Sequence, residues 1–381
     1  MKILHLWDNY APGLFDRSFE ICVDQGFEAH IACMHFIDRQ QPPGTNTLYV
    51  RRTNSENRGR TILERIWRKV RLLADRHQFR RLVRKTVRKL DPDIIHIHYG
   101  TTAAMFAGEH DVLARAIIIS FYGFDISQGV RTPSIRKAYK RLMTRRPLVH
   151  VLCAEAANRI SELGAEQDRI VDANLPLAID LYPYIGVAES SAFRWLMPAR
   201  FVEKKGHAVA LQAFSRHLES QPESRLTCWG YGDPDWLRSL VNELGLSGTV
   251  EVIDNSSEGL FDDAYLACLK EHDAVLAPSI RSSRGDDEGG PALTAVLAQV
   301  AGKPVIVSDF PGHERSVTNG VEGLVVRQGD VIALTAAMQE LSADRKQARE
   351  MGKAGRERAS REFSEEAYRE ALLGWYRSLA S

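Results

Sequence analysis

The 381-residue sequence contains no run of eighteen apolar residues, so no segment is long enough to cross a membrane as a helix. Its five cysteines are scattered and form no Cys-x-x-Cys pair, which indicates buried thiols in a reducing compartment rather than disulfides or metal ligands. The apolar start is short and meets Asp8, so we expect a first buried strand and no signal peptide. Internal repeats and low-complexity segments are also missing. These absences favour an ordinary globular protein, and the length favours two domains.

Charge of either sign is nearly balanced, with 50 Lys/Arg against 49 Asp/Glu, but it is unevenly placed. Residues 51–90 carry fifteen basic and three acidic residues, and residues 131–146 carry seven basic residues and no acid. Apolar residues interleaved with these charges predict an amphipathic helix: Trp67, Leu72, Leu73, Phe79 and Leu82. One interpretation is a solvated basic face, and the other is attraction to an anionic membrane surface or a lipid-pyrophosphate. No nucleic-acid motif accompanies the charge, so nucleic acid is not an expected partner.

Short apolar runs alternate with helix-like segments along most of the chain, which predicts parallel sheets covered on both faces. The first series of expected strands is 2–7, 29–34, 94–98, 116–121 and 148–153. The second series is 195–197, 225–229, 250–253, 274–277, 305–308 and 323–326. Helices are expected at 15–25, 154–163, 207–218 and 235–244. Two such series predict two Rossmann-like α/β domains.

The boundary between the domains is expected near residues 181–192, where Pro183, Gly186 and two serines interrupt the pattern. A last helix is expected at 363–379, because Tyr368, Leu372 and Tyr376 recur with a helical period. We therefore expect an N-terminal domain of residues 1–187 with about 363–381, and a C-terminal domain of residues 188–362.

The most informative motif is the stretch 287–293, in which an acid pair and two glycines precede an apolar helix. Such a loop presents free backbone N–H groups at a positive helix end, which suits a phosphate. Glu288 would lie beside that phosphate, where its carboxylate could bind a sugar hydroxyl. Gly302-Lys303-Pro304 ends the helix, and an apolar strand follows.

Two cations leave the first strand of the second domain in one loop, Arg200 and Lys205. Ligands of open α/β sheets bind at the carboxyl ends of the strands, so this pair could neutralise a diphosphate. Gly230-Tyr231-Gly232 ends another strand, where glycines allow the backbone to approach a flat ring or a ribose. An ordinary tight turn explains that tripeptide equally well.

In the first domain, His96 and His98 lie on one face of a strand. Such a pair can bind a metal, but no third ligand is evident nearby, so we expect these histidines to line a cleft or to pack as satisfied polar groups. Tyr122 could contact a substrate, and Asp125 could act as a base or, by default, cap a helix. The loop that contains Gly13 should face the second domain.

These motifs together resemble the GT-B glycosyltransferases, and among them the large retaining family 4, over nearly the whole chain. The matching pieces are the opening strand, 92–98, 122–125, 200–206, 230–232, 277–279, 285–291 and 302–304. The resemblance implies two Rossmann-like domains that face a cleft, with the last helix crossing back to the N-terminal domain. It places the nucleotide-sugar donor on the C-terminal domain and the acceptor on the N-terminal domain.

By matching motif positions, the resemblance implies that Arg200 and Lys205 hold the diphosphate and that Glu288 holds donor-sugar hydroxyls. The implied donor-binding residues are Gly230, Tyr231, Ile253, Gly289, Gly290, Pro291, Ala292 and Leu293. The implied acceptor-binding residues are Gly13, His98, Tyr122 and Asp125. No metal is expected, because the basic pair replaces it, and no cofactor is expected beyond the nucleotide-diphospho-sugar, which is a co-substrate.

The function implied is a retaining, metal-independent transfer of a sugar to a saccharide or lipid-linked acceptor in surface polysaccharide synthesis. The expected location is the cytoplasm, with residues 51–90 as a means of peripheral docking on the inner membrane face. Two alternatives stay open: a catalytically silent partner or scaffold with the same fold, and a sugar-nucleotide epimerase.

Three positions depart from the family pattern. The family has two glutamates separated by seven residues, and Glu288 matches the first while Val296 stands at the second. Because valine accepts no hydrogen bond from a ribose, the ribose is held otherwise, the nucleotide differs, or the donor site is impaired. Tyr122-Gly123 replaces a His-Gly pair, and the glycine-rich N-terminal loop is reduced to Pro12-Gly13.

Overall fold

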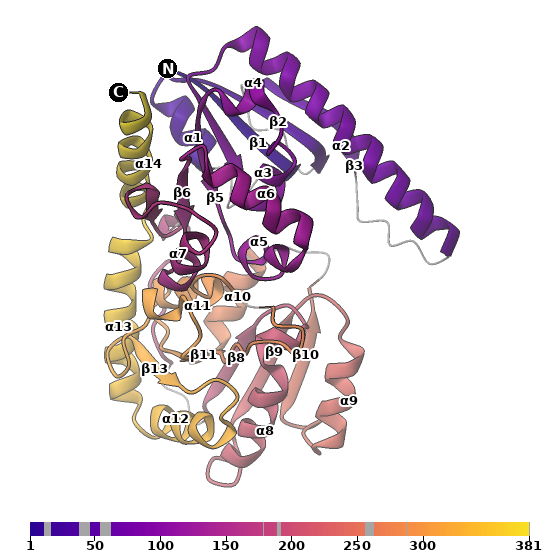
Figure 1. The fold of residues 1–381 in the computed structure, drawn as a ribbon. Helices are drawn as coiled ribbons and strands as arrows, with labels where there is room; N and C mark the ends of the chain where they lie inside the picture. The colour runs from indigo at the N-terminus through magenta and orange to yellow at the C-terminus, as the bar shows by residue number, and fades with distance from the viewer. Residues whose placement is uncertain are drawn as a thin grey trace. The chain divides into compact units, whose positions relative to one another are not determined.

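The computed structural model describes residues 1–10, 17–37, 46–53, 62–177, 179–188, 192–255, 263–286 and 288–380. The chain divides into two compact units (Figure 1). Unit 1 comprises Met1–Pro176 and Glu366–Ser381, and unit 2 comprises Leu177–Glu365. Each unit is built on its own parallel sheet with helices, as the expected fold class requires.

Unit 1 contains a seven-stranded sheet of order β3-β2-β1-β4-β5-β6-β7, in which every neighbouring pair is parallel. Its strands are β1 (Lys2–Tyr10), β2 (Glu28–Ile37), β3 (Asn46–Thr53), β4 (Ile94–His98), β5 (Ala116–Ser120), β6 (Leu148–Val151) and β7 (Ile170–Asp172). The register pairs His5 with His96 and His98 with Ser120, so polar side chains from neighbouring strands meet near the carboxyl ends.

The helices of unit 1 cover both faces of this sheet. They are α1 (Arg17–Asp24), α2 (Ile62–Leu90), α3 (Gly100–Ala104), α4 (His110–Leu113), α5 (Phe124–Ser127), α6 (Pro133–Met143), α7 (Ala154–Ser161) and α14 (Glu365–Ala380). The short 3₁₀ turns are η1 (Gly129–Arg131) and η2 (Gln167–Arg169). One apolar core unites the alternating residues Leu4, Leu6, Ile95 and Ile97 with α2, α3 and α6, and a second lies on the opposite face.

The C-terminal helix α14 completes this second core. Tyr368, Leu372 and Tyr376 are buried at successive turns of α14 and pack with Ile3 and Ile94 of the sheet. An apolar stripe at that spacing needs a partner surface, and the sheet of unit 1 supplies it. The expected return of the last helix to the N-terminal domain is therefore confirmed.

The basic segment 51–90 forms two elements rather than one helix. Residues 51–53 end strand β3, and α2 begins at Ile62. In the second half of α2, Phe79, Val83 and Val87 are fully buried four residues apart, which fixes this half on the sheet. Among the described residues, no helix is both long and apolar enough to cross a membrane.

Unit 2 contains a six-stranded parallel sheet of order β10-β9-β8-β11-β12-β13. Its strands are β8 (Arg194–Pro198), β9 (Arg225–Gly230), β10 (Val250–Asp254), β11 (Ala274–Ala277), β12 (Val305–Ser308) and β13 (Gly323–Val326). Its helices are α8 (His207–His217), α9 (Asp235–Glu243), α10 (Asp263–Glu271), α11 (Leu293–Val300), α12 (Val331–Ala343) and α13 (Arg345–Glu362). The 3₁₀ turns are η3 (Ile179–Leu181), η4 (Glu203–Lys205) and η5 (His313–Arg315). The strand order reverses between β8 and β11, which is where ligands bind in folds of this type.

Candidate functional site

In unit 2, the loop after β8 is packed tightly against the loop after β11. Gly206 adopts a left-handed conformation with φ of 78°, and a Cβ at this position would lie 2.0 Å from the carbonyl oxygen of Pro278. The backbone N–H of Ile280 donates to the carbonyl of Lys204, at 2.8 Å. Only glycine permits this approach. The turn η4 therefore brings Lys204 and Lys205 to the carboxyl end of the sheet.

Glu288 is the centre of the polar contacts at this edge. The Nζ atom of Lys205 lies 2.9 Å from Oε1 and 3.0 Å from Oε2 of Glu288. Ser279 donates its hydroxyl to Oε1 at 3.1 Å, and Lys204 Nζ lies 4.0 Å from Oε2. Lys204 also pairs with Asp286, at 3.2 Å. Two of the residues predicted from the sequence, Lys205 and Glu288, are thus joined in one nearly buried ion pair.

Burial works against ionisation of Glu288, but the neighbouring lysines outweigh it. Lys205 and Lys204 attract the carboxylate, and the pKa of Glu288 falls to about 2. His313 contributes in the same direction. The carboxylate is therefore ionised at neutral pH and can accept hydrogen bonds from hydroxyl groups.

The third predicted residue, Arg200, leaves the end of β8 in the same loop and is half-buried. Within the described ranges its guanidinium makes no ion pair or hydrogen bond, so it can bind an anion. Helix α11 begins after Ala292, whose side chain cannot cap the helix, so the first N–H groups lack a side-chain partner. Gly289 has φ of 69°, and the backbone of Gly290 lies directly against Gly312. The start of α11 thus has backbone N–H groups without a side-chain cap, and their use by a phosphate stays a prediction.

Gly230 packs the end of β9 against the loop that carries Arg200. A Cβ on Gly230 would lie 1.9 Å from the carbonyl oxygen of Ala199. The group that closely approaches Gly230 on this side is therefore protein backbone. The side chain of Tyr231 is 39% exposed. Ile253 is half-buried on β10 and lines a groove of about 730 Å³ beside α10, together with Trp229. None of Arg200, Lys205 and Glu288 lines this groove, so it is separate from the charged edge.

Val296 lies in the second turn of α11 and is completely buried. Every residue of α11 from Ala295 to Val300 is buried in the core of unit 2. A carboxylate at position 296 would lose its solvation in these surroundings. The valine thus continues the apolar character of the helix, and it offers no group to a ribose.

In unit 1, a directed chain of hydrogen bonds ends at Tyr122. Cys22 donates its thiol to the carbonyl of Ser18, so its sulfur accepts from Nε2 of His5, 3.6 Å away. The Nδ1 atom of His5 then accepts from Nε2 of His98 at 3.1 Å. Nδ1 of His98 in turn accepts the hydroxyl proton of Tyr122, at 2.7 Å. Two predicted acceptor residues, His98 and Tyr122, are therefore bonded to each other.

A second series of hydrogen bonds links His150, Ser120, His96 and Tyr376 in unit 1. Nε2 of His150 donates to the carbonyl of Ala173, so Nδ1 accepts the hydroxyl of Ser120 at 3.1 Å. Ser120 accepts from Nε2 of His96 at 2.8 Å, and Nδ1 of His96 accepts the hydroxyl of Tyr376 at 2.8 Å. Both chains require neutral histidines, and burial lowers the pKa of His5 to about 3 and the pKa of His96 well below its usual value.

The sequence missed a third histidine at this place. Ligand atoms of His5, His96 and His98 all lie within 4.8 Å of one another, so the statement that no third ligand lies nearby is wrong. Every ring nitrogen of the three is nevertheless engaged in the two chains. The rings of His96 and His98 are stacked, with their centroids 4.1 Å apart. The arrangement is that of satisfied polar groups.

Asp125 is a buried capping residue. Its carboxylate accepts hydrogen bonds from the backbone N–H groups of Gly100, Tyr122 and Gly123, at 2.7, 3.1 and 3.0 Å. Burial raises its pKa to about 6, although these N–H groups favour the charged form. The carboxylate holds the loop of Tyr122 against α3. Gly13, the remaining predicted acceptor residue, lies outside the described residues.

Two family models match the chain, one in each unit. The model described as glycosyl transferases group 1 matches residues 188–358, and the model described as a glycosyl transferase 4-like domain matches residues 18–171. A relative in Erwinia amylovora, the amylovoran biosynthesis glycosyltransferase AmsK, is 27% identical over 284 residues, which are 73% of this chain and 68% of AmsK. The lipopolysaccharide core biosynthesis glycosyltransferase LpsD of Rhizobium meliloti is 27% identical over 328 residues, 84% of this chain and 85% of LpsD.

Solved structures share the fold over the full length. Sucrose-phosphate synthase from Thermosynechococcus elongatus superimposes with a TM-score of 0.78 at 18% identity, covering 99% of this chain and 98% of that one. Alr3699/HepE from Anabaena, solved with UDP and glucose, has a TM-score of 0.74 at 16% identity, covering 99% and 100%. Together with the two parallel α/β units and the returning C-terminal helix, these matches show that the chain belongs to the GT-B glycosyltransferases of the GT4 type.

Proposed function

We propose that this glycosyltransferase moves a sugar from a nucleotide-diphospho-sugar to a saccharide or lipid-linked acceptor in the synthesis of a surface polysaccharide or glycolipid. The observation that carries the proposal is the Lys205–Glu288 pair at the carboxyl edge of the unit 2 sheet. Arg200 lies in the same loop as Lys205, and α11 begins shortly after Glu288. The names of AmsK and LpsD support the polysaccharide context, and the UDP and glucose bound by HepE support a nucleotide-sugar donor.

In the proposed donor site, different residues bind the diphosphate and the sugar. Arg200 and Lys205 neutralise the diphosphate, whose charge grows as the bond to the sugar breaks. Glu288 accepts hydrogen bonds from sugar hydroxyls and so orients the anomeric carbon. Cations preorganised at the leaving group do the work that a divalent metal does elsewhere, so the proposed reaction needs no metal and no further cofactor.

In the proposed retaining reaction, the acceptor hydroxyl attacks the same face of the sugar from which the diphosphate leaves. The bond from the anomeric carbon to the phosphate oxygen breaks, a bond to the acceptor oxygen forms, and the proton passes to the leaving phosphate. This route needs no protein base.

A thermal-shift panel of UDP, GDP, CMP, ADP and dTDP, each with and without common sugars, tests the donor site. We expect one nucleotide to stabilise the wild type, and we expect Lys205→Ala to lose this shift. Lys353→Ala, an exposed lysine of unit 2, is the matched control and should keep it. No shift with any nucleotide would overturn the donor proposal and favour a silent partner.

Turnover with and without an acceptor separates transfer from epimerisation. With the nucleotide sugar that binds, transfer gives a product only when a saccharide acceptor is added, whereas an epimerase alters the donor alone. Glu288→Ala should lower the rate by roughly 10²–10³-fold, the range for loss of one preorganised polar contact. A rate unchanged in Glu288→Ala would refute the assigned role.

We further propose that α2 docks the protein on an anionic membrane surface. Trp67, Val70 and Leu73 follow one another at intervals of three residues and are 69%, 52% and 65% exposed. The first turns of α2 stand clear of the sheet of their own unit (Figure 1). Exposed Arg71 and Arg76 lie between and beyond these side chains. A helix with apolar and basic side chains exposed together suits the interface of an anionic bilayer.

Co-sedimentation with phosphatidylglycerol vesicles and with neutral phosphatidylcholine vesicles tests this surface. Wild type should bind the anionic vesicles alone, and added salt should weaken binding. Charge reversal of Arg71, Arg76 and Arg81 should abolish it, and Trp67→Ala should reduce it. Charge reversal of Lys270, Lys346 and Lys353, three exposed lysines of unit 2, is the control. Equal binding by all variants would refute docking through α2.

A further inference from the structure

His313, the first residue of η5, carries a ring nitrogen that has no partner. The side chain is 1% exposed. Its Nδ1 atom lies 3.0 Å from the carbonyl oxygen of Ser308 and therefore carries the proton that it donates. Its Nε2 atom is buried and accepts no hydrogen bond from any described residue. A buried polar atom in this condition is costly, which suggests that the native cycle supplies a partner in another state.

The turn that carries His313 lies beside the proposed donor site. His313 interacts electrostatically with both Glu288 and Lys205. Gly312, with φ of 102°, packs so closely that a Cβ would lie 2.4 Å from the carbonyl carbon of Gly290. The turn that holds His313 therefore rests on the loop that holds Glu288.

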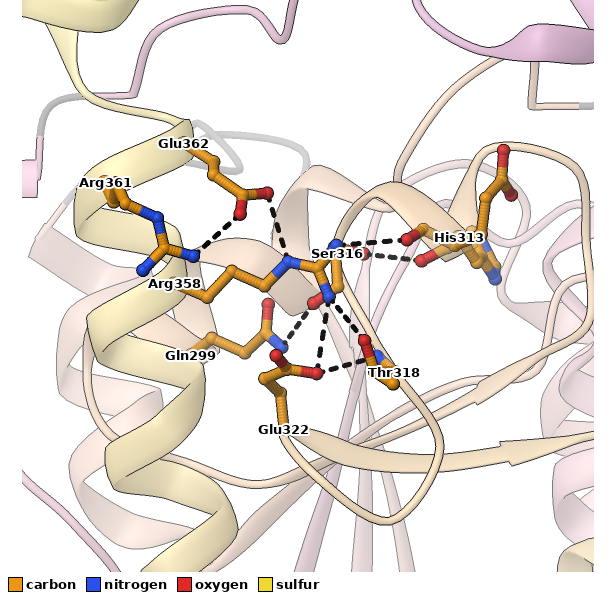
Figure 2. Close-up of polar contacts among 9 residues, drawn as sticks. Gln299, His313, Ser316, Thr318, Glu322, Arg358, Arg361 and Glu362 are labelled. Carbon is orange, nitrogen blue, oxygen red and sulfur yellow. Dashed lines mark hydrogen bonds and ion pairs between the residues drawn. The ribbon is translucent and has the colours of Figure 1, made fainter.

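Side chains of two helices, α11 and α13, hold the segment after His313 by hydrogen bonds (Figure 2). Arg358 of α13 donates to the hydroxyl of Thr318 at 2.9 Å and to the carbonyl of Glu314 at 3.2 Å. Its guanidinium also pairs with Glu322, at 3.3 Å. Gln299 of α11 donates to the carbonyl of Ser316 at 2.9 Å. With its backbone held in this way, His313 can respond to a change of charge by protonation more easily than by movement.

Binding of a diphosphate would change the charge around Glu288. Lys205 Nζ lies 2.9 and 3.0 Å from the two oxygens of Glu288, so a diphosphate that binds this ammonium competes with the carboxylate for it. Among the described residues, Glu288 would then keep the hydroxyl of Ser279 and Lys204, whose Nζ lies 4.0 Å away. A nearly buried carboxylate that loses its cation needs a replacement.

We infer that His313 takes up a proton when the diphosphate of the donor draws Lys205 away from Glu288, and that its Nε2–H becomes the new partner of this carboxylate. The inference rests on the proposed donor site. The proton comes from solvent, and no covalent bond changes. His313 is then a positioning residue, which keeps Glu288 ionised and in place for the sugar hydroxyls.

The charged and polar groups around His313 determine in which direction its pKa changes when the donor binds. Burial lowers its pKa, Glu288 and the Ser308 carbonyl raise it, Lys205 lowers it, and Glu314 raises it. Departure of Lys205 removes one cause of the low value, and the two phosphates add negative charge nearby. The bound state therefore has a higher pKa than the free state, and binding takes up protons between the two values.

His207 is the competing proton acceptor. Neither of its ring nitrogens has a hydrogen-bond partner among the described residues, and burial together with Lys205 lowers its pKa to about 3. Its ring faces Phe201 and Trp236, with centroids 5.6 and 6.0 Å away. No carboxylate contributes to its pKa, so its proton would have no anion to bond. Separate variants distinguish the two histidines.

Calorimetric titration with UDP, GDP, CDP, ADP and dTDP, in buffers of different ionisation enthalpy from about pH 5.5 to pH 8, measures protons taken up on binding. We expect the binding nucleotide to take up as much as about one proton at the optimal pH. His313→Asn, which keeps a donor for the Ser308 carbonyl, should bind without uptake. Glu288→Gln should also abolish uptake, whereas His207→Asn should retain it.

The possible failures are distinguishable. If none of the five nucleotides binds, the proposed donor site is wrong, and this inference falls with it. If a nucleotide binds wild type with no proton uptake at any pH, only the inference is overturned. Uptake that persists in His313→Asn, or disappears in His207→Asn alone, assigns the proton elsewhere and also overturns it. Because Glu288→Gln tests the same step from the other partner, a failure of His313→Asn to fold leaves the test intact.

Discussion

The polar clusters at the carboxyl ends of the two sheets differ in how completely they are satisfied. In unit 1, His5, His96 and His98 are neutral, and every ring nitrogen has a partner. In unit 2, the cluster is charged, and both His207 and His313 bury unpartnered nitrogens. A network in which every polar atom has a partner fixes one arrangement of its own side chains. A charged network with unpartnered polar atoms can still form hydrogen bonds to a ligand. The unit 1 cluster therefore has the properties of a structural framework, and the unit 2 cluster has those expected of the proposed donor site.

The largest effect should come from acid, because buried histidines of both clusters lose their contribution to stability below pH 6.5 and Glu288 loses its contribution only below pH 4.5. Burial lowers the pKa of His5 from 6.5 to about 3, so the unfolded chain binds the proton first and stability is lost as pH falls below 6.5. His207, lowered to about 3, and His217, lowered to about 4, act in the same direction. Glu288, lowered from 4.5 to about 2, loses its contribution only below pH 4.5. Each group contributes up to about 1.4 kcal/mol per pH unit within its window.

Urea unfolding at a series of pH values measures these windows. We expect stability to fall from pH 6.5 downward, and Glu288→Gln to remove only the part of the loss that lies below pH 4.5. Asp125 acts against this trend, since its raised pKa of about 6 gives stability that is present below 3.8 and lost as pH rises through 6. Stability that stays constant between about pH 7 and pH 5 would contradict neutral, buried histidines.

The next largest expected effect is a loss of stability when the Lys205–Glu288 ion pair of unit 2 is broken. Lys205→Met should destabilise the protein by about 3 kcal/mol, because it leaves the Glu288 carboxylate buried with a more distant cation. The double variant Lys205→Met/Glu288→Gln should recover most of this loss, since no charge is then stranded. Urea unfolding at neutral pH gives both values.

The control for this pair is Lys353→Met, which removes an exposed lysine of the same unit. It should change stability by less than about 0.5 kcal/mol. If Lys205→Met behaved like Lys353→Met, the ion pair would contribute little, and the two clusters would not differ as described.

Most strands could be predicted because each is a short apolar run between helical segments. The carboxyl-edge rule likewise placed Arg200, Lys205 and Glu288 near one another, although 83 residues separate the last two. Strand β3 was missed because its apolar run, Leu48 to Val50, is only three residues long, and its last residues continue into the basic pattern of α2. Strand β7 was missed because its three residues are too few for a pattern.

The sequence did not show that His5 and His313 belong to these two clusters. His5 shares a face with His96 only because β1 lies beside β4 in that register, so a strand order had to be assumed before the third histidine could be found. That assumption was available, since Rossmann-like sheets place the first strand next to the fourth. His313 gave no signal, because a single histidine in a loop shows neither its burial nor its missing partner.

The smallest effect tests whether the unit 1 network is closed. Tyr376→Phe removes only the hydroxyl that donates to Nδ1 of His96, and it leaves the apolar packing of α14 in place. The stranded acceptor should cost about 1–2 kcal/mol, measured by urea unfolding. Tyr231→Phe is the matched control in unit 2, because this tyrosine is 39% exposed and its hydroxyl bonds to no described residue. A loss in Tyr376→Phe alone means that satisfaction of the buried histidines stabilises unit 1, whereas equal results would mean that its hydrogen bonds do not distinguish it from the open cluster of unit 2.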